Sequence, residues 1–127
     1  MGDRANIYVK EGDSGVYLYT HWGGSELPQV VKVALSRHQR WDDGQYLARI
    51  LFDTLTENQT GSETGHGISS VIGDNSYPII VVNVDTQEVG LVRQGQEDEP
   101  NDLAMSFQSY VEAPDERLQA DFHRAPA

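Results

Sequence analysis

The sequence contains no cysteine, which excludes a disulfide framework, a thiolate metal site and a cysteine nucleophile. It is also poor in basic residues, with nine Lys and Arg against 20 Asp and Glu. Those nine form no cluster, so direct binding to the phosphates of nucleic acid is not expected. The net charge of −11 is instead compatible with a basic protein as partner.

Long apolar runs are missing as well. The longest, at residues 78–82, is far short of the roughly 20 residues that cross a bilayer. Residues 1–4 lack the charged and then apolar layout of a signal peptide. We therefore expect a cytoplasmic protein that makes no membrane contact. The length of 127 residues fits one compact domain.

Alternating side chains predict a β-hairpin near the start of the chain. Residues 5–11 place Ile7 and Val9 on one side, and residues 16–21 alternate in the same way. The segment between them, 12–15, is Gly-Asp-Ser-Gly, which is typical of a tight turn.

Two amphipathic helices are predicted next. Apolar residues recur at three- and four-residue steps over 26–38, and Ser25 is placed to cap that helix. A second helix is predicted over 43–55, after an acidic cap at 42–43. Residues 56–67 then form a polar loop.

Three further strands are predicted over 68–72, 78–85 and 88–93. The middle one is apolar on both faces, which favours a central place in the sheet. The rest of the chain holds an acidic loop, a short helix over 103–111 and a flexible tail over 113–127.

These elements predict an α+β fold. We expect a five-stranded, mostly antiparallel sheet in the order ββααβββ, with two helices on one face and a short C-terminal helix, all within a single domain at 1–112. The opposite face would be aromatic and apolar, carrying Tyr8, Tyr17, Tyr19, Ile79 and Val81. An exposed face of that size is unusual in a monomer, so we expect either a homodimer or a cover formed by the C-terminal segment.

Several short sequence blocks resemble those of a known family. Residues 2–6 read GDRAN and residues 21–24 read HWGG. Further blocks lie at 18–20, 40–43, 63–65 and 77–85. Over residues 1–92 the chain resembles a family of small bacterial and phage proteins that carries these blocks in the same order. The resemblance implies that habitat and brings no activity, cofactor or partner; the family's aromatic residue at the position of His66 weakens a catalytic role for that histidine.

Topology gathers polar residues at one end of the predicted sheet. In a hairpin the start of the first strand lies beside the end of the second. The second helix returns the loop that follows it to this end, and the turn at 85–87 would join them. The candidate ligand-binding residues are Asp3, Arg4, His21, Trp22, Gly23, Gly24, Glu63 and His66.

Two interpretations of this end are open. Residues 23–24 could present backbone N–H groups to an anion at a helix N-terminus, with Arg4 as a cation and His21 as the candidate catalytic acid or base. Alternatively, the two glycines only turn the chain, Trp22 plugs the base of the sheet and Asp3 pairs with Arg4.

No metal site is predicted. The histidines lack the HxH or HExxH spacing of zinc sites. Four acids at the opposite end could bind Ca²⁺, although helix caps and turns account for each of them separately. These four are Asp13, Asp42, Asp43 and Asp74. No cofactor can be named from the sequence.

Three functions are open. The sequence favours a small acidic binding protein, homodimeric or bound to another protein, because no catalytic spacing is present. The second is a phage-type anti-defence inhibitor whose acidic surface occupies a nucleic-acid-binding partner, since residues 95–127 hold eight acids against two arginines. The third is a small enzyme acting on an anionic substrate at Arg4, His21, Gly23 and Gly24.

Overall fold

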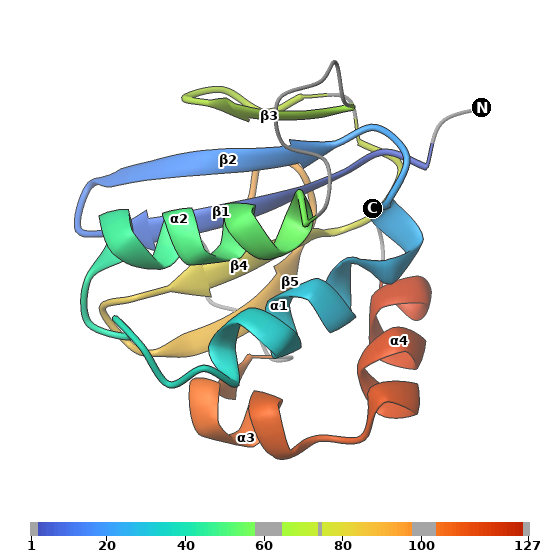
Figure 1. The fold of residues 1–127 in the computed structure, drawn as a ribbon. Coiled ribbons are helices and arrows are strands. Elements are labelled where there is room, and N and C mark those ends of the chain that lie inside the picture. Colours follow the sequence, from blue (N-terminus) through green and yellow to red (C-terminus); the bar gives the residue numbers. More distant parts are fainter. Residues whose placement is uncertain (1–2, 58–64, 74, 98–103, 126–127) are drawn as a thin grey trace.

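A computed structural model describes residues 3–57, 65–73, 75–97 and 104–125. Its single sheet has the strand order β3-β2-β1-β4-β5-β6. Helices α1 and α2 lie against one face of this sheet, and α3 and α4 pack against α1 (Figure 1). The elements are β1 Ala5–Glu11, β2 Ser14–Thr20, the 3-10 turn η1 Gly24–Glu26, α1 Leu27–Leu35, α2 Gly44–Leu55, β3 His66–Ser69, β4 Ile79–Asn83, β5 Glu88–Val92, β6 Met105–Ser106, α3 Phe107–Glu112 and α4 Asp115–Arg124. Within these ranges no helix has both the length and the apolar character to span a bilayer.

The predicted hairpin and central strand are confirmed. β1 pairs with β2 from Ala5↔Thr20 to Glu11↔Ser14. Gly12 adopts a φ of 60°, a left-handed conformation that suits such a tight turn. β4 lies between β1 and β5 and is buried on both faces. Since β4 pairs parallel to β1 and the other neighbouring strands pair antiparallel, the sheet is mostly antiparallel.

The sheet has six strands rather than five. β6 pairs with the outer edge of β5 immediately before α3 begins. A strand of two residues carries no alternation of side chains, so no periodic pattern predicts it. α1 is also shorter than predicted, because His38 and Arg40 adopt positive φ angles of 54° and 60° that end the helical path.

Residues 113–127, expected to form a flexible tail, contain α4. Leu118 and Phe122 lie one turn apart on this helix and are both buried in the main core. The ring of Phe122 stacks on Tyr77 with centroids 5.0 Å apart. Lys32 Nζ on α1 donates to the carbonyl of Ala113 at 2.7 Å. Two apolar side chains are a weak sequence signal, and tertiary contacts stabilise the helix.

The aromatic face of the sheet is covered within the single chain. Ile79 is fully buried, and Tyr17 and Val81 are only 9% and 6% exposed, while Tyr8 and Tyr19 are half-buried. The Tyr17 hydroxyl donates to Glu97, so the segment after β5 reaches back across this face to β2. Ile72 packs on the same face, whereas the C-terminal helices α3 and α4 pack against α1 on the opposite side of the sheet. The C-terminal helices are therefore not the cover, and the buried part of this face is closed by segments next to β4 and β5.

Candidate functional site

Asp3 lies beside the start of the first helical segment, η1. Its backbone carbonyl accepts from the Gly24 N–H at 2.8 Å. Its carboxylate accepts from the Ser25 N–H at 2.9 Å and from the Ser25 hydroxyl at 2.8 Å. Ser25 is thus not the side-chain cap that the sequence predicted; Asp3, 22 residues earlier, satisfies these helix-start donors instead.

The backbone N–H groups of Gly23 and Gly24 also have hydrogen-bond acceptors within the fold. The Gly23 N–H donates to the Thr20 hydroxyl at 2.9 Å. A Cβ atom on Gly24 would lie 2.6 Å from the Asp3 carbonyl oxygen, so only glycine fits this close approach. The backbone donors proposed for an anion already have internal acceptors. The geometry therefore supports the interpretation in which these glycines turn the chain.

Three residues at this end were not found from the sequence. The Tyr77 hydroxyl donates to Asp3 at 2.6 Å, and Gln119 Nε2 donates to the Ser25 carbonyl at 2.8 Å. His123 Nε2 lies 3.2 Å from the same carbonyl oxygen. Burial raises the pKa of Asp3, but the hydrogen bonds from Tyr77 and Ser25 outweigh it and leave that pKa below its ordinary value.

The parallel pairing of β4 with β1 explains why Tyr77 was missed, and Gln119 and His123 lie on α4, which the sequence did not predict. The parallel pairing places the start of β4, and with it Tyr77, beside the start of β1. It also moves the turn at 85–87 to the opposite end, where Asp85 accepts from the Gly12 N–H at 2.7 Å. The prediction that this turn lies near Asp3 is therefore wrong.

The two histidines of the predicted site lie on opposite faces of the sheet. His21 Nδ1 is 3.0 Å from the hydroxyl of Tyr19, on the aromatic face. His66 pairs with Thr20 in the β2–β3 ladder and so shares the helix-bearing face with it. Arg4 lies at the start of β1, half-buried, with its carbonyl bonded to the Ser76 N–H. Glu63 lies outside the described residues.

The described part of the chain contains no group of three His, Asp or Glu side chains that could hold a metal ion. Among the four acids of the second predicted cluster, Asp43 caps α2 by accepting from the Tyr46 N–H at 3.4 Å. Asp74 lies outside the described residues. Local capping therefore accounts for Asp43.

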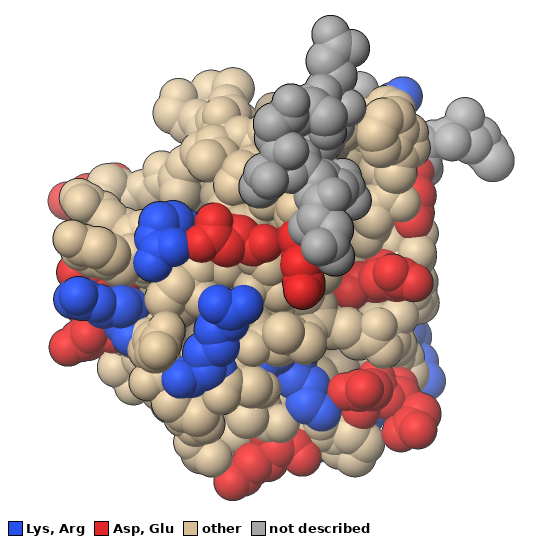
Figure 2. Space-filling view, in the orientation of Figure 1, with Lys and Arg blue, Asp and Glu red and all other residues tan. Residues whose placement is uncertain are grey.

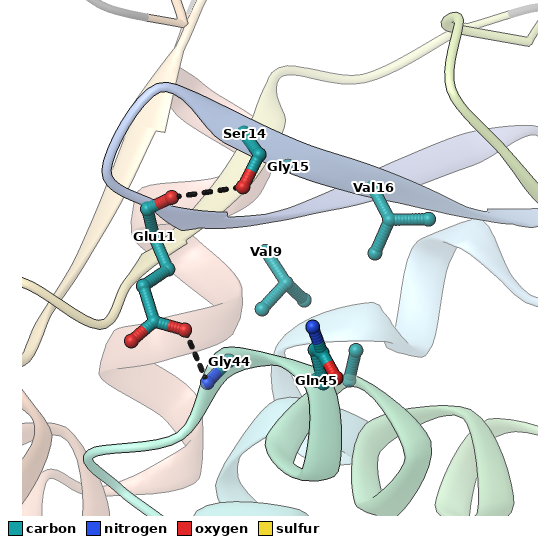
Figure 3. A pocket seen from close by; sticks show the side chains of 8 residues that line it. Val9, Glu11, Ser14, Gly15, Val16, Gly44 and Gln45 are labelled. Atoms are coloured by element: carbon teal, nitrogen blue, oxygen red, sulfur yellow. Dashed lines mark hydrogen bonds between the residues drawn. The ribbon is translucent and has the colours of Figure 1, made fainter.

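A groove that the sequence did not predict follows one flank of α2. One part of it, with a volume of about 190 Å³, lies between β1, β2 and the start of α2. Figure 3 shows Val9 and Val16 directed toward Gln45, with the Glu11 carboxylate accepting from the Gly44 N–H at 2.9 Å. We call this feature the α2 groove. Its lining residues are Val9, Glu11, Ser14, Gly15, Val16, Leu18, Gly44, Gln45, Ala48, Arg49, Phe52 and Ile68.

The α2 groove is apolar where it meets β3. Leu18, Phe52 and Ile68 line this second part, which has a volume of about 270 Å³. Ile68 remains 59% exposed even though it faces the helix side of the sheet beside Leu18. This exposure arises because α2 packs on β1 and β2 and no helix of the described chain covers β3 (Figure 1).

A separate pocket lies one helical turn further along α2. We call it the Trp22 pocket. Its volume is about 210 Å³, and its walls come from the end of β2, the start of α1, the end of α2 and β3. The indole of Trp22 is 64% exposed. The lining residues are Trp22, Gly23, Glu26, Val30, Leu55 and His66.

Charge on the helix-bearing face is mixed. In Figure 2 the Lys and Arg side chains alternate with Asp and Glu across this face. Two of the contacts are ion pairs, Lys32–Asp115 at 2.8 Å and Arg49–Asp53 at 2.6 Å. Such a face does not present the continuous negative surface that imitation of nucleic acid requires.

Comparison with known proteins adds no assignment. No family model, curated protein or solved structure matches the chain. The family resemblance carried by residues 2–6 and 21–24 therefore stays a prediction, and function has to be inferred from the geometry of the groove, the pocket and the sheet edge.

Proposed function

We propose that this protein is a binding module that adds an extended segment of a partner protein to the outer edge of β3. The observation that carries the proposal is Ile68, an exposed apolar side chain on an edge strand that also lines the α2 groove. In strand addition, main-chain hydrogen bonds supply affinity and pockets for alternate side chains supply specificity. The edge of β3 and the groove beside it provide both.

The composition of this edge supports the proposal. Proteins usually protect sheet edges with charged residues or proline. Residues 65–73 contain neither, in a chain with 20 acidic and nine basic residues. β3 covers only Tyr17 to Thr20 of β2, so the edge continues onto the first residues of β2, beside the α2 groove. Among the described residues no strand pairs with this edge.

The test uses peptides selected on the immobilised protein from a random display library. We expect them to slow hydrogen exchange at the backbone amides of His66 and Ile68, which point to the free edge because Gly65, Gly67 and Ser69 occupy the hydrogen-bonded positions of the β2–β3 ladder. The substitution Ile68→Lys should weaken their binding by about tenfold or more, because it places a charge in the apolar wall. Val33→Lys is the matched control, since Val33 is 53% exposed on α1, outside the groove.

Equal binding of the peptides to wild type and Ile68→Lys would overturn the proposal, as would protection confined to other amides. Sedimentation of the protein alone provides the competing outcome. A dimer that Ile68→Lys dissociates and Val33→Lys preserves would assign the edge to a second copy rather than to another protein.

A further inference from the structure

We infer that the Trp22 pocket receives a guanidinium or ammonium side chain of the partner segment. This inference rests on the proposed function, because it names the chemistry of the partner that lies along β3. The argument has three parts: an aromatic surface held in place, a carboxylate beside it, and the position of the pocket relative to β3.

The indole of Trp22 is both exposed and fixed. A Cβ atom on Gly65 would lie 2.7 Å from Cε3 of Trp22, so the indole packs directly on the glycine backbone. His21 contacts the indole edge-to-face, with centroids 5.3 Å apart. An exposed tryptophan that is already immobilised loses little conformational freedom when a ligand binds, which is a feature of binding hot spots.

The charge of the pocket selects a cation. Glu26 is exposed and lines the pocket, and within the described residues its carboxylate has no hydrogen bond or ion pair. No Lys or Arg is among the described residues that line the pocket. A tryptophan face attracts cations more strongly than the other aromatic rings do, and the chain as a whole carries a net charge of −11. The predicted site therefore has the opposite charge preference to the anion site considered from the sequence.

The position of the pocket defines a sequence pattern in the partner. His66 lies two residues from Ile68 on the same face of β3, and it lines the Trp22 pocket. Side chains of a strand that point to one face are spaced about 7 Å apart. A partner strand along β3 that directs an apolar residue toward Ile68 therefore directs the residue two positions away toward Trp22. We expect an apolar residue and an Arg or Lys separated by one residue.

The experiment is a titration of the ¹⁵N-labelled full chain followed by NMR. The chain has only two tryptophans, so it gives two indole N–H signals. Trp41 serves as internal reference, because its indole N–H donates to the Leu35 carbonyl at 3.2 Å away from the pocket. The probes are two blocked peptides, Thr-Val-Thr-Arg-Thr and Thr-Arg-Thr-Val-Thr, since the strand direction is not specified. Each is paired with a copy in which neutral citrulline replaces arginine.

We expect one arginine peptide to shift the Trp22 indole signal and to bind about tenfold tighter than its citrulline copy. Glu26→Gln and Trp22→Leu should each reduce that preference to about twofold without weakening the citrulline peptide as much. Glu116→Gln is the control for overall charge, because Glu116 is exposed on α4. Thermal melting of each variant verifies that it folds.

The outcomes separate this inference from the proposed function. If the arginine and citrulline peptides bind equally and still protect the amides of His66 and Ile68, the pocket does not discriminate charge and only this inference fails. If neither peptide nor the display-selected peptides protect these amides, the proposed function fails as well. If blocked arginine alone shifts the Trp22 signal as strongly as the peptides do, the pocket binds a free cation and its assignment to a partner strand is overturned.

Discussion

At the scale of single residues, the end of the sheet near Asp3 depends on close fit. Asp3 accepts hydrogen bonds from Ser25 and Tyr77, while the backbone of Gly24 passes so near Asp3 that a side chain would not fit. The second glycine of the HWGG block is therefore a requirement of the fold. The tryptophan of the same block is exposed and remains available for binding.

Alanine substitutions at the two glycines of that block should lower the free energy of unfolding by different amounts. Gly24→Ala should lower the free energy of unfolding by about 2 kcal/mol or more, because its Cβ would meet the backbone of Asp3 and the ring of Tyr77. Gly23→Ala should cost less than about 1 kcal/mol, since its Cβ would meet only the Thr20 hydroxyl at 3.1 Å. Urea unfolding measures both, and equal costs would contradict the assigned packing.

Asp3 predicts a specific acid dependence of stability. Its pKa in the folded protein is below the ordinary value of 3.8, so the ionised carboxylate stabilises the fold at neutral pH. That contribution is present above pH 3.8 and is lost as the pH falls through the lowered pKa. Wild type should therefore lose stability relative to Asp3→Asn between about pH 4 and pH 2, measured as the difference in urea midpoints. Parallel curves for the two proteins over that range would argue against the assigned role.

At the scale of elements, α4 shows how a weak sequence signal becomes an ordered helix. It has only two buried apolar residues, Leu118 and Phe122, and most of its other side chains are charged or polar. Lys32 ties its start to α1 through the Ala113 carbonyl and Asp115, while Gln119 and His123 bond to the Ser25 carbonyl. These partners are distant in sequence, so no local pattern reveals them.

The role of α4 is tested by truncating its buried ring. Phe122→Ala should lower the free energy of unfolding by about 3 kcal/mol, because the ring is fully buried and stacks on Tyr77. Glu116→Ala, exposed on the same helix, should change it by less than about 0.5 kcal/mol. Chemical denaturation distinguishes the two variants. A flexible tail would instead make both substitutions neutral.

At the scale of the whole molecule, the sheet is buried unevenly. The aromatic face is covered by the chain itself, including Ile72 and Glu97. On the opposite face the helices cover β2, β1, β4 and β5 and leave β3 beside an open groove. Among the described residues, the three most exposed large apolar side chains, Trp22, Ile68 and Val71, lie on or next to β3, which is where we place binding.

Closure of the aromatic face predicts that folding does not require a second copy. The melting temperature should be the same over roughly a hundredfold range of protein concentration, because obligate dimers melt at temperatures that rise with concentration. Val81→Asp should lower it strongly at every concentration, since Val81 is 6% exposed within the chain. A melting temperature that rises with concentration in wild type and not in Ile68→Lys would point to dimerisation through β3.

Local patterns were sufficient to predict the hairpin, the two main helices and the central strand. Each of these elements has a repeat in its own residues: alternation in β1 and β2, three- and four-residue steps in α1 and α2, and a continuous apolar run in β4. β6 and α4 lack such a repeat. The same limit applied to the candidate site. The sequence predicted Asp3, Trp22 and His66 at one end of the sheet, but their faces and partners depend on residues distant in sequence.

The sequence by itself determined an acidic, cysteine-free α+β domain with a central strand in its sheet, because charge, composition and short-range periodicity are properties of the chain alone. Only the tertiary structure decided that β4 runs parallel to β1, and this crossover brought Tyr77 to Asp3 and sent Asp85 to the hairpin turn. It also decided which surface stays open. Coverage depends on how helices of fixed length lie across a sheet of six strands, and here they leave β3, Ile68 and Trp22 exposed.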